Sequence, residues 1–540
     1  MRHERNAVEP RSEIEGRRGL GPAPSLVGER WRPHWGRRVS GPVDAGPQAP
    51  GPAGSLTQRA AHGVRWTAAA MIVVSVLQFA QLAVLARLLP RTDFGLMAMI
   101  TVVLAFGAAY ADMGLSNAII HRQDPTKDQL SSLYWLNVLA GVCVFAAVLA
   151  LTPVIAAFYR EPRLVHLLPL AGLIFVITPF AQQFQALLQK SLRFRFLATV
   201  DMCAAAVGAA TAVVCAVGGL GVLSLIAGQL AMTAVRAAAL CVVGWRFDRP
   251  RLHFRWRDTR GYVSFGMYQM GEKSVNQLSA NLDYLVIGRI LGPAALGPYA
   301  LAYQLVVMPM VRINPVLTRV AFPVFALRQN DRGALRRGYA QISRLLVFGV
   351  YPLLVGLAVL APVVVPVVFG NKWEEAVPLV QLLAIMSMVK TLSNPSGSVF
   401  LAIGRANVGF WLNLGVALIA LVGFVIAAKY GGVTAVAWTW IAIAAVVYSI
   451  ILLLLHRLIG LGLREYFVAL RRPLWIVAAS GLVVAAAYWA LSPLIASPLL
   501  LLGVLASLGV ATYVAVWYVV DRAYVVGMLR VLAGRTAGES

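Results

Sequence analysis

Long runs of apolar residues separated by short polar loops fill the chain from about residue 63 to residue 520. Because a helix rises about 1.5 Å per residue, roughly 20 such residues cross a hydrocarbon core of about 30 Å. Barrel strands would alternate apolar and polar positions, and these runs do not. The pattern predicts an all-α polytopic membrane protein of about fourteen transmembrane helices, at 64–89, 95–120, 132–157, 166–188, 197–217, 220–244, 262–290, 294–323, 340–369, 376–402, 406–428, 432–456, 474–495 and 497–520.

The composition agrees with a membrane protein. Hydrophobic residues make up 59% of the chain, charged residues 13%, and the mean hydropathy is +0.74. The formal net charge of +25 lies mostly in short loops, which favours lipid headgroups over nucleic acid as the partner. The four cysteines and seven histidines show no metal-ligand spacing, so no metal site is expected.

The basic residues of the loops predict the orientation of the helices. One set of alternate loops carries 23 Lys and Arg residues, and the other set carries seven. Because the basic loops of membrane proteins stay in the cytoplasm, both termini are expected to be cytoplasmic.

The chain contains an internal repeat. LARLLPRTDFG at 85–95 aligns with IGRILGPAALG at 287–297, with an offset of 202 that pairs Arg87 with Arg289 and Gly95 with Gly297. Two parallel six-helix copies are therefore expected, and such transporters bind substrate near the midplane between the halves. The expected parts are an extension (1–62), an N-terminal bundle (63–245), a basic linker (246–261), a C-terminal bundle (262–457), two added helices (458–520) and a cytoplasmic tail (521–540).

The extension, residues 1–62, is rich in Pro, Gly and Arg and has no apolar periodicity. This composition predicts a disordered cytoplasmic segment. A second interpretation is that translation starts further in, near Leu56 or Val64. The intact mass of the purified protein would decide between them.

A polar stripe marks the span at 262–290. Glu272, Asn276, Ser279 and Asp283 lie at i, i+4, i+7 and i+11, and Lys273 lies beside them. An ionisable group near the bilayer centre costs at least about 2.5 kcal/mol, so such groups are functional candidates. The stripe either lines a water-filled cavity or pairs with neighbouring helices for structure alone.

Two later spans add polar candidates. Gln304 and Arg312 lie in 294–323, and a guanidinium binds phosphate through paired donors. Lys390 and Asn394 lie in 376–402, where Pro395 is expected to break the helix and expose backbone to a cavity.

Other spans contribute three charged residues. Arg236 is a further candidate for binding an anion, and Asp112 for binding a coupling cation. Asp201, near the cytoplasmic end of its span, is expected to form a structural ion pair.

Three segments carry a family resemblance: LARLLPRTDFGLMAMITVVLAFGAAYADMGLSNAIIHR, LLQKSLRFRF and IGRILGPAALGPYALAYQL. They resemble the polysaccharide-transporter branch of the MOP flippases, with Wzx-type and colanic-acid-exporter-like lipid-linked oligosaccharide flippases as the nearest kind. The resemblance covers residues 57 to about 470. It implies two six-helix bundles around a central cationic cavity, and a non-enzymatic protein of the bacterial inner membrane. The implied activity is translocation of undecaprenyl-pyrophosphate-linked repeat units to the periplasmic leaflet.

These expectations combine into one mechanism. Basic residues would replace the lost hydration of the pyrophosphate, acidic residues would take up a coupling proton or sodium ion, and polar residues would line the cavity. No other cofactor is expected. The expected partners are the lipid-linked oligosaccharide, membrane lipids, and polysaccharide polymerase and export machinery. The three groups are Lys273, Arg312, Lys390 and Arg236; Glu272, Asp283 and Asp112; and Asn276, Ser279, Gln304 and Asn394.

Other functions remain alternatives at this stage. A multidrug extruder or a peptidoglycan-precursor flippase would use the same scaffold, but cationic drugs would favour acidic cavity walls. A membrane glycosyltransferase or polymerase would need longer outer loops than this chain has. A membrane scaffold without transport would not need charges on the 262–290 stripe.

Overall fold

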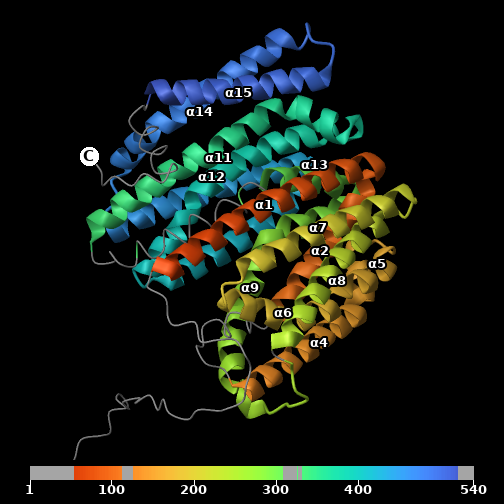
Figure 1. Ribbon diagram of the computed structural model, residues 1–540. Helices are drawn as coiled ribbons and strands as arrows, with labels where there is room; N and C mark the ends of the chain where they lie inside the picture. Colours follow the sequence, from red (N-terminus) through yellow and green to blue (C-terminus); the bar gives the residue numbers. More distant parts are fainter. Residues whose placement is uncertain are drawn as a thin grey trace, which may run out of the picture. The chain divides into compact units, whose positions relative to one another are not determined.

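The computed structural model describes residues 54–111, 126–247, 249–307 and 331–520, together with residues 310 and 325 (Figure 1). The contacts described below lie within one compact unit, Leu56–Ser540. The described residues form helices and short connections, without strands.

The first half of the chain forms seven described helices, which correspond to the first six predicted spans because α5 and α6 share one. They are α1 (Gly54–Leu88), α2 (Arg91–Ala111), α4 (Lys127–Tyr159), α5 (Leu164–Gly172), α6 (Ile174–Lys190), α7 (Phe194–Val217) and α8 (Val222–Phe247).

The second half begins with a long helix and ends with a helical pair. Its elements are α9 (Trp256–Leu291), a helix over 293–307, α11 (Arg332–Phe369), the short 3-10 helix η1 (Asn371–Trp373), α12 (Ala376–Ala402), α13 (Ala406–Ile459), α14 (Leu463–Leu491) and α15 (Pro498–Val520). At Gly432 the backbone of α13 leaves the helical region, with φ of 66°, so α13 is two helices joined at a kink.

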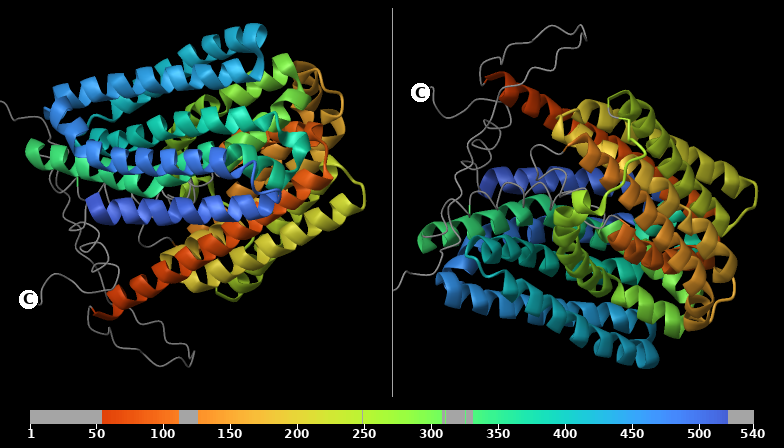
Figure 2. Two further views of the ribbon diagram at one scale, coloured as in Figure 1. Left: turned by 90° about the horizontal axis from the view of Figure 1, so that it is seen from above. Right: turned by 90° about the horizontal axis from the view of Figure 1, so that it is seen from below.

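Helices of each half lie together, and α9 joins the two groups. Figures 1 and 2 show α4–α8 gathered in one group and α11–α15 in another. Helix α9 packs against α2 and α4 of the first half and against α13 of the second. Side chains on α9 are therefore placed to meet residues of both halves.

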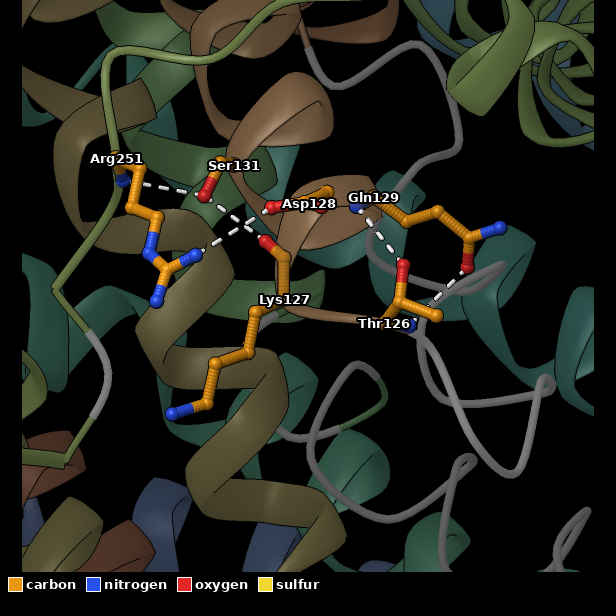
Figure 3. A network of polar contacts seen from close by, with 6 residues as sticks. All are labelled: Thr126, Lys127, Asp128, Gln129, Ser131 and Arg251. Carbon is orange, nitrogen blue, oxygen red and sulfur yellow. Dashed lines mark hydrogen bonds and ion pairs between the residues drawn. The ribbon is translucent and has the colours of Figure 1, made fainter.

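The start of α4 shows how local sequence fixes a helix and the linker beside it. Thr126 and Gln129 form a reciprocal capping box, with both hydrogen bonds at 3.2 Å (Figure 3). The backbone N–H of Arg251 donates to Ser131 Oγ at 3.1 Å, and the indole of Trp135 donates to the Arg251 carbonyl at 2.8 Å. The linker between α8 and α9 is therefore fixed to the first turns of α4.

The helices follow the predicted spans closely. Eleven described spans are long and apolar enough to cross a membrane, counting α5 with α6 as one and α13 as one. Helix α9 is not among the eleven, and the predicted span 294–323 is described only in part. The all-α polytopic class is confirmed, and the count of fourteen stays a prediction.

Three details differ from the sequence expectations. Helix α1 already includes residues 54–62, which were assigned to the extension, and α9 begins at Trp256, within the expected linker. The break expected at Pro395 is wrong, because α12 is continuous through it. Pro395 is buried, and packing against neighbouring helices holds α12 helical although the Pro395 ring supplies no N–H to the Thr391 carbonyl.

The two halves cross at the starts of α2 and the helix over 293–307. A Cβ placed on Gly95 would lie 1.9 Å from the Pro293 carbonyl oxygen, and one on Gly297 would lie 2.1 Å from that of Arg91. The repeat offset of 202 relates Gly95 to Gly297, and it also relates Arg91 to Pro293. The contact is thus reciprocal, as expected where two related units meet about a pseudo-two-fold axis.

A polar clasp surrounds this crossing; we use the name for Arg87, Arg91, Lys372, Trp373 and Glu375. Lys372 Nζ donates to the carbonyls of Arg87 and Leu89 at 2.9 and 2.8 Å, and the Trp373 indole donates to that of Ala86 at 2.8 Å. Arg87 Nε donates to the Val368 carbonyl at 2.9 Å, and Arg91 pairs with Glu375 at 2.6 Å. Burial, and then the nearby Arg91, lower the pKa of the Lys372 ammonium.

The crossing yields a stability prediction. Gly95→Ala and Gly297→Ala should each destabilise the protein by about 1–3 kcal/mol, because the added methyl meets backbone that has little room to move. The measurement is the apparent Tm of purified protein in detergent.

Gly349→Ala is the matched control, because a Cβ there meets nothing within 4 Å and the position is inside α11. It should leave the Tm unchanged or raise it, since alanine favours a helix. Equal Tm values for all three variants would contradict the close crossing.

Candidate functional site

Asp283 on α9 is a fully buried carboxylate. Its Oδ2 accepts hydrogen bonds from the Tyr299 hydroxyl at 2.7 Å and the Trp440 indole at 2.9 Å. Its Oδ1 accepts from the backbone N–H of Tyr284 at 2.9 Å. Asp283 and Tyr299 are 0% exposed and Trp440 is 5% exposed, so water contributes little to these contacts.

Lys390 on α12 lies on the other side of this contact. Its ammonium nitrogen is 4.9 Å from the centre of the Trp440 ring, within the range of a cation–π interaction. Lys390 and Asp283 also interact electrostatically, although Lys390 is exposed and Asp283 is buried. Trp440 therefore contacts both charged groups at once.

Aromatic packing holds the buried carboxylate in place. Tyr284, Tyr299 and Tyr303 contact one another with ring centroids 5.5 to 6.3 Å apart, and Phe424 lies 5.1 Å from Trp440. These residues come from α9, the helix over 293–307 and both parts of α13. The cluster thus depends on helices that are distant in the sequence.

The other predicted polar residues have different exposures. Asn276, Gln304 and Asn394 are exposed, whereas Ser279 and Lys273 are half-buried. On α12, Lys390 and Asn394 are one helical turn apart and share a face.

Arg236 lies in a separate part of the first half. Its Nε is 3.0 Å from Asp201 Oδ1, so the ion pair connects α8 to α7. The structural ion pair expected for Asp201 is present. The charge of Arg236 is accordingly shared with a carboxylate in the first half, while the Asp283 cluster belongs to the second.

Three predicted residues are beyond what the structure shows. Arg312 and Asp112 lie outside the described residues, and so does the side chain of Glu272. Their roles stay predictions.

Tyr299 and Trp440 are the site residues that sequence reasoning missed. Tyrosine and tryptophan are common at membrane interfaces, which hides members that act as buried donors. The available signal was that both lie well inside apolar runs, where an O–H or N–H needs a partner.

The arrangement can hold a small cation and an anion close together. A carboxylate can be neutralised by a proton or a monovalent cation, and a lysine ammonium can bind a phosphate. No cluster of three or more His, Cys, Asp or Glu residues that could hold a metal occurs among the described residues.

The chain is similar to known proteins of polysaccharide synthesis. Residues 84–378 match a family described as "Polysaccharide biosynthesis protein". Teichuronic acid biosynthesis protein TuaB of Bacillus subtilis (strain 168) is 34% identical over 429 residues, 79% of this chain and 89% of TuaB. Lipopolysaccharide biosynthesis protein WzxC of Escherichia coli (strain K12) is 32% identical over 424 residues, 78% of this chain and 86% of WzxC.

Among solved structures, the lipid II flippase MurJ in an inward closed conformation has the same fold. The TM-score is 0.67 at 12% identity, covering 85% of this chain and 99% of MurJ. At that identity the likeness concerns the fold alone. The family match covers more than half of the chain, and TuaB and WzxC align over most of their lengths, so the chain belongs to this polysaccharide biosynthesis protein family.

Proposed function

We propose that this protein translocates undecaprenyl-pyrophosphate-linked oligosaccharide repeat units across the bacterial inner membrane for surface polysaccharide synthesis. Family membership and the relatives' roles in teichuronic acid and lipopolysaccharide biosynthesis support the cargo class. The all-α membrane fold shared with a lipid II flippase supports transport rather than a reaction at a soluble active site.

The observation that carries the proposal is Lys390, a residue with exposed side-chain surface that lies deep inside an apolar span. A lysine facing hydrocarbon would cost at least about 2.5 kcal/mol, so an exposed one favours a water-filled space between helices. Asn394, Asn276 and Gln304, also exposed, would line the same space. Lys390, with Lys273 and Arg312, would replace the hydration that the pyrophosphate loses, while the lipid tail stays in the bilayer.

Asp283 is our candidate for coupling transport to an ion gradient. A buried carboxylate inside a membrane binds a proton or sodium ion more readily than it stays charged without a partner. Glu272 and Asp112 are further candidates for ion coupling. Arg236 is a candidate for binding the anionic cargo, which would have to displace Asp201 from it.

The clasp would be a gate in alternating access. It joins the halves at the ends of helices that the loop charges assign to the periplasm, so the described state would be closed outward. Both termini would be cytoplasmic, and polymerase or export machinery would receive the cargo on the far side.

A multidrug extruder is disfavoured by the same site. Cationic drugs would be repelled by the positive charge of Lys390, whereas a pyrophosphate would be attracted to it.

The first functional prediction concerns Lys390. In a deletion strain of the host bacterium, wild type should restore surface polysaccharide, and Lys390→Gln should lower the amount restored about tenfold or more, because a charge-assisted contact with the anion is lost. Lys273→Ala and Arg312→Ala should also lower it. The measurement is surface polysaccharide at matched protein levels.

Lys429→Gln is the control, because Lys429 is an exposed lysine near the Gly432 kink, away from the proposed pathway. It should restore polysaccharide as wild type does. If deletion of the gene left surface polysaccharide unchanged, the proposed function would be overturned; if Lys390→Gln matched wild type, the site assignment would be.

The second prediction concerns the gate. In a variant whose native cysteines are replaced by alanine, Arg91→Cys and Glu375→Cys joined by a short, cleavable thiol cross-linker should lose most transport, because the halves cannot separate at that end. Cleaving the linker should restore it. Each single cysteine variant treated with the same reagent is the control, and full transport in the cross-linked protein would mean that this end does not open.

A further inference from the structure

Trp440 is the residue that contacts both members of the charged pair. Its indole N–H donates to Asp283 Oδ2 at 2.9 Å, and its ring lies under the Lys390 ammonium, 4.9 Å from the nitrogen. Asp283 is on α9, Lys390 on α12 and Trp440 on α13, so the indole connects three helices. Its 5% exposure leaves it little freedom to move while these contacts are made.

We propose that Trp440 is a positioning residue that makes the hold on Lys390 depend on the charge of Asp283. This inference rests on the proposed function for its purpose, but the link itself can be measured without any cargo.

The physical basis lies in two parts of one indole ring, the N–H at its edge and its electron-rich face. An N–H that donates to an anion forms a stronger hydrogen bond than one that donates to a neutral group. Such a donor also makes its own ring richer in electrons, and connected polar contacts strengthen one another in this way. A charged Asp283 therefore both fixes the ring and strengthens its attraction for the ammonium.

Neutralising Asp283 would reverse both effects. When the carboxylate takes up a proton or a monovalent cation, the indole hydrogen bond weakens and the ring attracts the ammonium less. Lys390 also loses the nearby negative charge. The ammonium then becomes available to a pyrophosphate on its exposed side, so uptake of a cation would favour uptake of the anionic cargo.

The surroundings leave few other routes for this coupling. Among the described residues, the titratable groups facing Asp283 are Tyr284 on its own helix, Tyr299 and Tyr303 on the helix over 293–307, and Lys390 on α12. Tyr299 binds the same oxygen as Trp440, at 2.7 Å, but its ring contacts are with the other tyrosines. Tyr299 is therefore a matched comparison: it donates the same kind of bond without contacting Lys390 in the manner of Trp440.

The test is a double-mutant cycle on the full-length protein in lipid nanodiscs. The measured quantity is the acylation rate of the Lys390 amine by a small amine-reactive ester, read by peptide mass spectrometry. Asp283→Asn stands in for the neutralised carboxylate, and it is made in three backgrounds: wild type, Trp440→Phe and Tyr299→Phe. Exposed Lys429 is the internal reference for fold and reagent.

In the wild-type background, Asp283→Asn should raise the Lys390 acylation rate about threefold or more, because the reagent attacks the free amine and both the weaker hold of the ring and the loss of the negative charge make that amine more available. In the Trp440→Phe background, which keeps an aromatic face but lacks the N–H, the same change should raise the rate clearly less, because only the direct electrostatic interaction of Asp283 with Lys390 then remains. In the Tyr299→Phe background the threefold effect should remain.

Two results would overturn the link. An unchanged effect of Asp283→Asn in the Trp440→Phe background would show that the charges act directly through space. Loss of the effect in both the Trp440→Phe and Tyr299→Phe backgrounds would show a general dependence on packing. Since no cargo is present, a failed link is distinguished from a failed flippase function, which the polysaccharide measurement tests.

Discussion

The close approach of backbone at Gly95 and Gly297 is the constraint on which the arrangement of the halves depends. Two helix starts can cross at this distance only where neither carries a Cβ. Because the repeat supplies both glycines, each half provides the space that the other half fills. The crossing sets where the clasp residues meet, and it holds α9 against both groups of helices.

The cost of charge in a membrane explains the second feature of the molecule. Asp283 is buried but keeps three hydrogen bonds, and Arg236 keeps Asp201 at 3.0 Å. Both arrangements satisfy a charge locally, yet they differ in how the cation is held. Arg236 is paired directly with the Asp201 carboxylate, whereas Lys390 is held over the face of the Trp440 ring. That difference makes the first cluster the better candidate for binding an anionic cargo.

Hydropathy predicted the helices well because membrane solvation acts on each segment by itself. The limits of α7 and α12 lie within a few residues of the predicted spans. Residues 54–62 and the start of α9 were missed because a helix can continue into water, where no apolar run is required. Pro395 misled because a buried proline can stay within a helix that is packed among other helices, and that packing is not visible in the local sequence.

The site was predictable in part for a related reason. Asp283 and Lys390 stand out in apolar sequence, since each is costly there without a special environment. The two residues meet through Trp440, which lies 157 positions after Asp283 in the sequence. No local pattern encodes that contact. A tryptophan in an apolar run is normally interpreted as a packing residue, and only the acceptor of its N–H reveals a further role. A polar hydrogen that must find a partner in hydrocarbon therefore carries information about tertiary structure, and here it points from the middle of α13 to the carboxylate of α9.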